Sequence, residues 1–271
     1  MSSWFSYNDR AASSPPYSVL SKVYDEVMEE VNYEAWADFI DTLIQTHHPD
    51  PRYLLELACG TGTAAYYLDE LECYEILATD ASEEMIRAAR EKYGSGFPYL
   101  NFRVMNFNRI DLEQRFDVVF SLFDSINYLH HQRQLLRLFE DLGKVMQPGG
   151  LFIFDFTTPK NSREAVRTLD KESGQTEDGI TFHRESRFDE ERSVHLNRFT
   201  IKEWDTSKKD YNIWEEVHEQ RIYSLAEMLE VVEQSPLQLL AKYSGFELVD
   251  ADNNSLRITM VLQWPKTPSL N

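Results

Sequence analysis

The stretch YLLELACGTGTAAYYL, residues 53–68, decides the fold. The apolar run over residues 52–58 predicts a buried strand, and residues 63–71 carry apolar side chains at helical spacing. Gly60 and Gly62 lie between them, where they permit backbone conformations and a close approach that a Cβ would obstruct. The turn is either a plain tight connection or one wall of a ligand crevice, because a helix beginning there exposes free N–H groups.

The chain around this stretch alternates strand and helix signals. Further strands are predicted at residues 74–80, 99–106, 116–123 and 148–156, and helices at residues 82–94 and 131–146. Strands separated by helices predict right-handed crossovers and a parallel sheet that helices cover on both faces. The fold class is therefore α/β, a doubly wound and Rossmann-like arrangement.

The flanking segments complete this core. Residues 17–48 predict two helices, split near Val31 and Asn32. Toward the other end, helices are predicted at residues 224–235 and 237–246, and a closing pair of strands at residues 246–252 and 255–264.

A second region interrupts the core. Residues 179–223 hold three strand-like stretches separated by short, turn-rich breaks, which favours an antiparallel meander. We therefore expect a core with an N-terminal helical cover, residues 1–175 and 224–271, and a β-meander lid inserted at residues 176–223.

Composition limits the function. The chain has 271 residues and a net charge of −19, which argues against broad contact with nucleic acid. No apolar run is long enough to span a membrane, and the first residues do not resemble a secretory signal. Cys59 and Cys73 form neither a disulfide framework nor a metal site, so we expect a cytoplasmic protein without a bound metal. The sequence leaves a homodimer open.

Asp80 adds to the evidence of the glycine turn. It ends the second predicted strand, 20 residues after Gly60, where a carboxylate can accept hydrogen bonds from both hydroxyls of a ribose. The ligand is then a dinucleotide or another nucleoside. Spacing does not separate the two, because Ala65 stands at the third glycine position of the dinucleotide fingerprint and that position tolerates alanine.

The surrounding motifs distinguish a dinucleotide from another nucleoside as the ligand. ELACGTG (56–62) resembles the E/D-x-x-x-G-x-G motif of class I S-adenosylmethionine-dependent methyltransferases. VMNF (104–107), FDVVFSLFDSINYL (116–129), MQPGGLFIFDF (146–156) and YSGFEL (243–248) resemble later segments of small-molecule members of that family, in the same order. The resemblance covers nearly the whole chain. It implies a seven-stranded, mostly parallel sheet with an antiparallel last strand.

The resemblance also implies a cofactor and its site. S-adenosylmethionine would bind and leave as S-adenosylhomocysteine, with Asp80 on the ribose hydroxyls. Asn106 stands where the family usually has aspartate, and its carbonyl can accept from the adenine amine. Phe107 and Met85 would sandwich the base, with core packing as the alternative. The full expected cofactor site is Tyr24, Tyr33, Glu56, Ala58, Gly60, Gly62, Asp80, Ala81, Met85, Asn106, Phe107 and Leu122.

Methyl transfer needs few reactive side chains. The sulfonium is already a strong electrophile, so positioning and exclusion of water do much of the work. A general base helps only if the acceptor must lose a proton, and Tyr128 and His130 are the candidates. The resemblance places the acceptor beside Phe123, Asp124, Asn127 and Tyr128. For Asp124 and Asn127 the alternative is a loop network of backbone hydrogen bonds; for His130 and His131 it is capping or surface exposure.

The meander is expected to cover the acceptor with Phe182, His195, Phe199, Trp204 and Trp214, unless it forms a dimer surface. The sequence thus predicts an enzyme that methylates N or O of a small-molecule acceptor. A tRNA-modifying methyltransferase and a non-catalytic cofactor-binding regulator are the alternatives, with a dehydrogenase as a weaker one.

Overall fold

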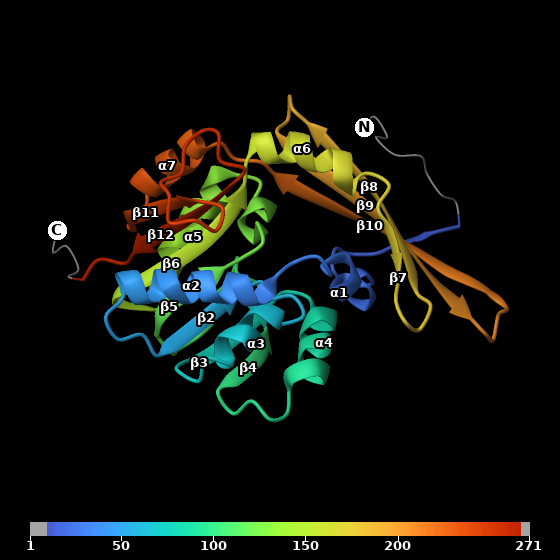
Figure 1. The fold of residues 1–271 in the computed structure, drawn as a ribbon, viewed down its shortest axis with the longest axis horizontal. Coiled ribbons are helices and arrows are strands. Elements are labelled where there is room, and N and C mark those ends of the chain that lie inside the picture. The colour runs from blue at the N-terminus through green and yellow to red at the C-terminus, as the bar shows by residue number, and fades with distance from the viewer. Residues whose placement is uncertain (1–9, 267–271) are drawn as a thin grey trace.

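The structure, a computed structural model, describes residues 10–266 and contains two sheets (Figure 1). The larger sheet has seven strands in the order β11-β12-β6-β5-β2-β3-β4. Their bounds are β2 Tyr53–Leu57, β3 Glu75–Asp80, β4 Leu100–Val104, β5 Phe116–Ser121, β6 Met146–Thr157, β11 Gln238–Ser244 and β12 Arg257–Gln263. Strand β12 runs antiparallel to both of its neighbours, and the other pairs are parallel. The predicted fold class is confirmed.

Helices cover both faces of this sheet. One face buries apolar side chains of α2 (Tyr33–His47), α3 (Thr63–Asp69) and α4 (Glu83–Tyr93). The opposite face buries those of α5 (Gln132–Leu142) and α7 (Leu225–Glu233). The sheet is therefore sealed from water on both faces, and its strand ends remain as the place for a ligand.

The smaller sheet has the order β1-β10-β9-β8-β7. Its strands are β1 Ala12–Ser13, β7 Ser173–Gln175, β8 Thr181–Asp189, β9 Val194–Asp205 and β10 Asp210–Arg221. Strands β8, β9 and β10 form the predicted antiparallel meander, and β1 from the other end of the chain pairs in parallel with β10.

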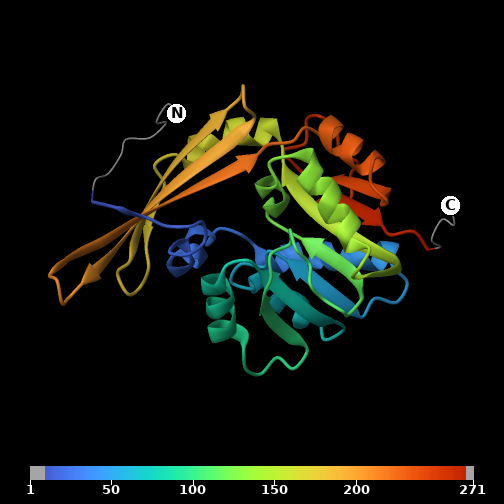
Figure 2. The ribbon, with the colours of Figure 1, turned by 180° about the vertical axis from the view of Figure 1, so that it is seen from behind.

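The segment that follows β1 lies between the two sheets, as the view from behind shows (Figure 2). It contains a 3-10 turn, η1 (Leu20–Lys22), and one helical turn, α1 (Tyr24–Val27). Leu20 and Val23 are buried against Phe182, Phe199 and Ile201 of the smaller sheet. We call residues 14–31 the N-terminal strap. The first of the two helices predicted at residues 17–48 is thus much shorter than expected, whereas the second is α2, capped by Asn32.

Two other predictions were wrong or incomplete. Residues 237–246 do not form a helix: most of them form the edge strand β11, which pairs with β12 through a bulge between Leu239 and Ala241. Residues 246–252 form a turn instead of a strand, apart from an isolated bridge between Asp250 and Tyr243. The reason is strand pairing. Residues 237–246 have a sequence pattern that suits a helix, but hydrogen bonding to the edge of β12 stabilises their extended form.

Helix α6 (Pro159–Leu169) was not predicted. Its local signals were present, because Thr158 caps the helix by accepting the N–H of Asn161, and Pro159 occupies the first turn. This helix packs against β8 and supplies one wall of the cavity described below.

Candidate active site

The glycine turn joins β2 to α3 and is held by Asp80. Gly60 has φ +55° and donates its N–H to Oδ2 of Asp80 at 2.9 Å. Ala58 is also left-handed, with φ +59°, a conformation that is uncommon outside glycine. Gly62 has φ +81°, and a Cβ there would lie 2.5 Å from the ring of Phe102. The second glycine is thus required for internal packing, and not only for approach to a ligand as the sequence suggested.

Asp80 can still bind a ribose. Its Oδ1 accepts the N–H of Ser82 at 2.8 Å, so each carboxylate oxygen holds one backbone donor. Burial raises the pKa of Asp80, against the backbone hydrogen bonds from Ser82, Gly60 and Ala81. A carboxylate oxygen has two lone pairs, so one acceptor position on each oxygen remains for a hydroxyl.

Glu56 lies at the same end of the sheet and is 2% exposed. One of its carboxylate oxygens, Oε2, is buried and has no hydrogen-bond partner within residues 10–266. Burial, and then the charge of Asp80, raise the pKa of Glu56 to about 8. An unpartnered buried carboxylate is costly unless a ligand supplies a donor, so the site fits the ammonium group of a methionine tail.

The aromatic cover of this crevice comes from the N-terminal strap and α2. The Tyr24 ring packs on Gly60, with its nearest atom 3.4 Å from the position of a Cβ. Tyr33 meets the Phe123 ring edge-on at a centroid distance of 5.1 Å. Both tyrosines therefore lie on the side of the crevice where the sequence placed them.

The residues predicted for adenine are Met85, Asn106 and Phe107. Met85 is fully buried in α4, whereas Asn106 is exposed and its Oδ1 accepts the N–H of Asn108 at 2.9 Å, which leaves one acceptor position on that oxygen. Of the other predicted cofactor residues, Leu122 is 1% exposed and Ala81 is exposed beside Asp80. Phe107 is half-buried and packs against the main core. The structure thus gathers the groups for the ribose and the methionine tail but does not assemble a base sandwich.

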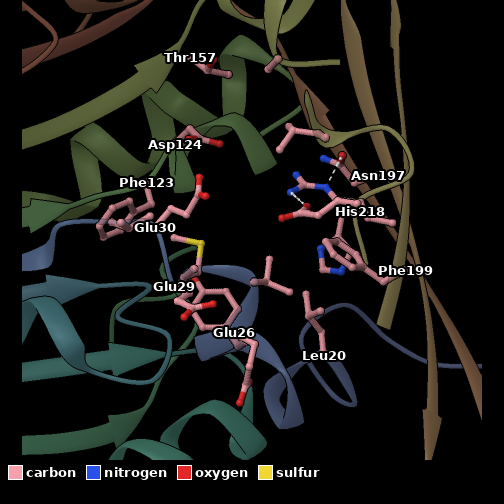
Figure 3. A pocket seen from close by; sticks show the side chains of 18 of the residues that line it. Leu20, Glu26, Glu29, Glu30, Phe123, Asp124, Thr157, Asn197, Phe199 and His218 are labelled. Atoms are coloured by element: carbon pink, nitrogen blue, oxygen red, sulfur yellow. Dashed lines mark hydrogen bonds and ion pairs between the residues drawn. The ribbon is translucent and has the colours of Figure 1, made fainter. Parts of the chain in front are cut away.

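A cavity of about 1050 Å³ separates the core from the smaller sheet (Figure 3). Phe123, Asp124 and Tyr128, three of the predicted acceptor residues, line it. Asn127 does not: its amide donates to the Arg221 carbonyl at 2.7 Å and accepts the N–H of Thr157 at 3.2 Å.

The two histidines that follow also lie away from this cavity. His130 Nε2 lies 2.8 Å from the Glu219 carbonyl oxygen, and His131 caps α5 in a capping box with Gln134. Asn127 therefore holds the loop, as its alternative interpretation stated, and of the two candidate bases only Tyr128 is at the cavity.

Asp124 is fixed by partners that the sequence analysis missed. Its carboxylate pairs with Arg257 of β12 at 2.6 Å and accepts from Gln220 at 2.5 Å. Its N–H donates to Asp155 at 3.0 Å, and Asp155 also pairs with Arg257. Burial raises the pKa of Asp155 to about 6, against the charge of Arg257.

The backbone of the same loop is strained. Phe123 and Asp124 both have positive φ, +58° and +52°, and such strain is typical of functional sites.

The smaller sheet contributes the far wall. Phe182, His195 and Phe199 line the cavity, as predicted for the lid. Trp204 and Trp214 do not: Trp204 is 48% exposed and meets Tyr211 edge-on, and Trp214 lies under the Lys22 ammonium.

His195 is buried, with Nε2 2.8 Å from the Ser186 hydroxyl. Burial lowers its pKa to about 4, so the ring is neutral at physiological pH.

Tyr17 is a cavity residue that the sequence barely marks. It stands in the strap with φ +63°, lines the cavity, and accepts the Ser82 hydroxyl proton on its backbone carbonyl at 2.8 Å. Only the Ser-Ser-Pro-Pro run before it marks a turn in the sequence. Tyr17 thus joins the cofactor crevice to the cavity.

Comparison with known proteins agrees with this geometry. A model of the methyltransferase-domain family matches residues 54–150. The "Putative methyltransferase YqeM" of Bacillus subtilis is 27% identical over 253 residues, 93% of this chain and 98% of that protein. A dTDP-3-amino-3,4,6-trideoxy-alpha-D-glucopyranose N,N-dimethyltransferase of Streptomyces venezuelae is 27% identical over 124 residues, 46% of this chain and 50% of that protein. An S-adenosylmethionine-dependent methyltransferase from Clostridium acetobutylicum superposes with a TM-score of 0.73 at 22% identity, covering 91% of this chain and 98% of that one.

The chain therefore contains a methyltransferase domain at residues 54–150, and its fold is that of S-adenosylmethionine-dependent methyltransferases, as its motifs predicted. The matched domain ends at residue 150, so the smaller sheet lies outside it. Within residues 10–266 no helix is long and apolar enough to cross a membrane, and no group of His, Cys, Asp and Glu side chains could hold a metal ion.

Proposed function

We propose that this enzyme methylates an amine nitrogen of a small molecule held between the core and the smaller sheet, with residues 176–223 as the acceptor cover. The observation that carries the proposal is the cavity itself, which meets the cofactor crevice at Tyr17 and Tyr128 and has the volume of a small-molecule site. A cytoplasmic location remains the expectation from cysteine usage.

The charges that line the cavity favour an amine. Of its five acidic and two basic lining residues, Glu172 pairs with Arg184 and Asp124 pairs with Arg257. The other three acidic residues belong to the strap itself and have no ion-pair partner among residues 10–266. They are Glu26, Glu29 and Glu30 (Figure 3). A negative cavity attracts an ammonium and repels a phosphate.

This charge balance favours a different acceptor from the one for which a relative is named. The Streptomyces venezuelae protein is named for a dTDP-linked amino sugar. An amino group suits the cavity described here, but a diphosphate would meet more acids than bases in it. We therefore propose an acceptor that carries an amine and no phosphate.

The residues of the chain position the reactants. The bound cofactor supplies an electrophilic methyl group. Glu56 and Asp80 bind its charged tail and its ribose, while the pairs from Asp124 to Arg257 and Gln220 fix the loop at the junction. The smaller sheet excludes water from the junction, which favours transfer to the acceptor over side reactions.

A paired acceptor panel tests this function. The purified full chain is incubated with methyl-labelled S-adenosylmethionine and pairs of compounds that differ only in an amine or a hydroxyl, including an amino sugar with and without a nucleoside diphosphate. We expect label in the amines, without benefit from the nucleotide. Label only in alcohols, only in nucleotide sugars or only in tRNA would reject the proposal. Calorimetry with S-adenosylhomocysteine establishes beforehand that the preparation binds cofactor.

A further inference from the structure

A row of hydrogen-bonded side chains runs from the cavity into the smaller sheet, and cofactor binding does not explain it. The Tyr17 hydroxyl lies 2.7 Å from the Tyr128 hydroxyl, which lies 2.9 Å from Nδ1 of His218. All three side chains line the cavity, and His218 is 2% exposed. They come from the strap, from the 3-10 turn η2 (Ser125–Tyr128) and from β10, so only the tertiary fold brings them together.

Glu216 closes the far end of this row. It is fully buried, and its Oε2 lies 3.4 Å from Nε2 of His218, which has no other partner within residues 10–266. Its carboxylate also accepts the backbone N–H groups of Tyr17 at 2.8 Å, of Leu20 at 2.9 Å and of Val19. Burial alone would raise the pKa of Glu216, but hydrogen bonds from His218, Leu20 and Val19 hold it below its ordinary value.

An ionised Glu216 decides which nitrogen of His218 carries the proton. A carboxylate beside Nε2 favours the tautomer with N–H on Nε2, because that N–H can donate to it. Nδ1 is then free of a proton and accepts the hydroxyl proton of Tyr128. The row has one direction: Tyr17 donates to Tyr128, and Tyr128 donates to His218.

The other end of the row borders the cofactor crevice, because the Tyr17 backbone is bound to Ser82 beside Asp80. The Tyr17 carbonyl accepts from Ser82, and the Ser82 N–H is bound to Asp80. Burial raises the pKa of Tyr17, as do Tyr128, Asp124 and Asp80, and burial also raises the pKa of Tyr128. Both phenols therefore stay protonated and can release a proton only when they receive another.

We propose that this row takes up the proton that the bound ammonium must lose before it can be methylated. The lone pair freed by that loss forms the bond to the methyl group, the electron pair of the broken bond stays with the thioether sulfur, and the methylated product leaves as an ammonium. The N–H proton passes to the Tyr17 oxygen, the Tyr17 proton to the Tyr128 oxygen, and the Tyr128 proton to Nδ1 of His218. The resulting imidazolium faces the Glu216 carboxylate. His218 acts through the tyrosines and is a positioning residue.

The groups that face His218 suit this role. Glu216 is the charge beside it on β10, Tyr17 and Tyr128 face it from the strap and η2, and the Phe199 ring of β9 packs against it at 5.5 Å. The guanidinium of Arg184 on β8 packs on the same Phe199 ring, 5.1 Å from its centroid, and is paired with Glu172. An imidazolium here thus has its counter-ion beside it, and the arginine that shares the Phe199 ring is already paired.

The first test does not need an acceptor. In the full chain labelled with ¹⁵N-histidine, the His218 signals are assigned by their loss in His218→Gln. We expect Nε2 to carry the proton at neutral pH, and Tyr128→Phe to shift the Nδ1 signal. His183 is the internal control, because its Nδ1 bonds the Ser173 hydroxyl in the same sheet while His183 itself does not line the cavity, so its signal should not respond. A proton on Nδ1, or an Nδ1 signal indifferent to Tyr128→Phe, would overturn the proposal.

The second test uses the amine that the acceptor panel labels fastest, and rests on the proposed function. His218→Gln should lower kcat by roughly 10²–10⁴-fold at neutral pH while leaving the affinity for S-adenosylhomocysteine unchanged. The loss should shrink as pH rises, because the amine then arrives already deprotonated. His183→Gln should keep the wild-type rate at every pH. A loss that is equal at every pH means that His218 is only structural. If no amine reacts, the proposed function fails and the nuclear magnetic resonance arm still decides the tautomer and its link to Tyr128.

Discussion

The cofactor crevice and the acceptor cavity are built in opposite ways. Glu56, Gly60, Asp80 and Ser82 lie within 27 consecutive residues and hold one another largely through backbone N–H groups. The cavity instead combines strap, η2, α6, the smaller sheet and β12, and its key pairs join residues far apart in the chain, such as Asp124 with Gln220 and with Arg257. The comparison teaches that cofactor binding is a local property of this chain, whereas acceptor binding depends on the whole fold.

Removing the smaller sheet tests that difference most severely. Replacing residues 176–223 with a short flexible linker should abolish methyl transfer, by roughly 10²-fold or more, because acceptor positioning is lost. Measurable binding of S-adenosylhomocysteine should remain, since the local crevice is intact. Calorimetry and labelled turnover measure the two. The deletion also exposes Leu20 and Val23, so circular dichroism and melting come first; a folded deletion variant with full turnover would contradict the cover.

Breaking the ion pair between Asp124 and Arg257 should have the next largest effect. Arg257→Met leaves Asp124 and the fully buried Asp155 without their cation, which should cost about 3–5 kcal/mol of unfolding free energy. Urea denaturation measures it. The matched control is Arg163→Met, which removes an exposed pair with Glu190 and should leave the urea midpoint nearly unchanged, because water screens exposed ion pairs. Equal losses in the two variants would mean that the buried network does not stabilise the cavity.

A smaller effect is expected inside the crevice. Asp80→Asn keeps one acceptor oxygen and should weaken S-adenosylhomocysteine binding by about 1–3 kcal/mol, because a ribose hydroxyl loses its charged partner. Asp80→Ala should bind more weakly still and also melt earlier, since Gly60 and Ser82 lose their acceptor. Calorimetry and melting curves separate the two losses. Unchanged affinity in folded Asp80→Asn would reject the ribose assignment.

The smallest expected effect is a pH dependence. The pKa of Glu56 is raised from 4.5 to about 8, so the folded protein keeps a proton that the unfolded chain releases, and stability falls as pH rises between these values. Asp155 acts in the same direction only up to its pKa of about 6, so the decline from pH 6 to 8 belongs to Glu56. Glu56→Gln should flatten it, and S-adenosylhomocysteine should reduce it. A wild-type melting temperature that is constant over this window would show that Glu56 is not held protonated.

The sequence predicted the local parts well. The strands of the core, the glycine turn and Asp80 were placed correctly, because apolar periodicity and turn chemistry act over a few residues. Helix α4 lies within the predicted range of residues 82–94, and Ser82 caps it by accepting the N–H of Met85.

The predictions that failed concern contacts between residues far apart in the chain. Strand β11 was mistaken for a helix because only the edge of β12 selects its extended form. Arg257 sits in an apolar strand with nothing nearby to mark Asp124 as its partner, and Tyr17 and His218 meet across 200 residues of chain. Asn127 and His130 were chosen for their nearness to a motif, but their side chains turn to the backbone carbonyls of Arg221 and Glu219.

The strap has a kinetic consequence. Glu216 holds its backbone, Tyr24 lies on Gly60, and Tyr17 reaches the cavity, so one segment covers the cofactor and also borders the acceptor. A cofactor bound beneath Tyr24, as the proposed site requires, would leave only if this segment lifted, and lifting it would part Tyr17 from Tyr128. Exchange and chemistry would then alternate on one segment, and the lifetime of its closed form would set an upper limit on turnover however fast the methyl group moves.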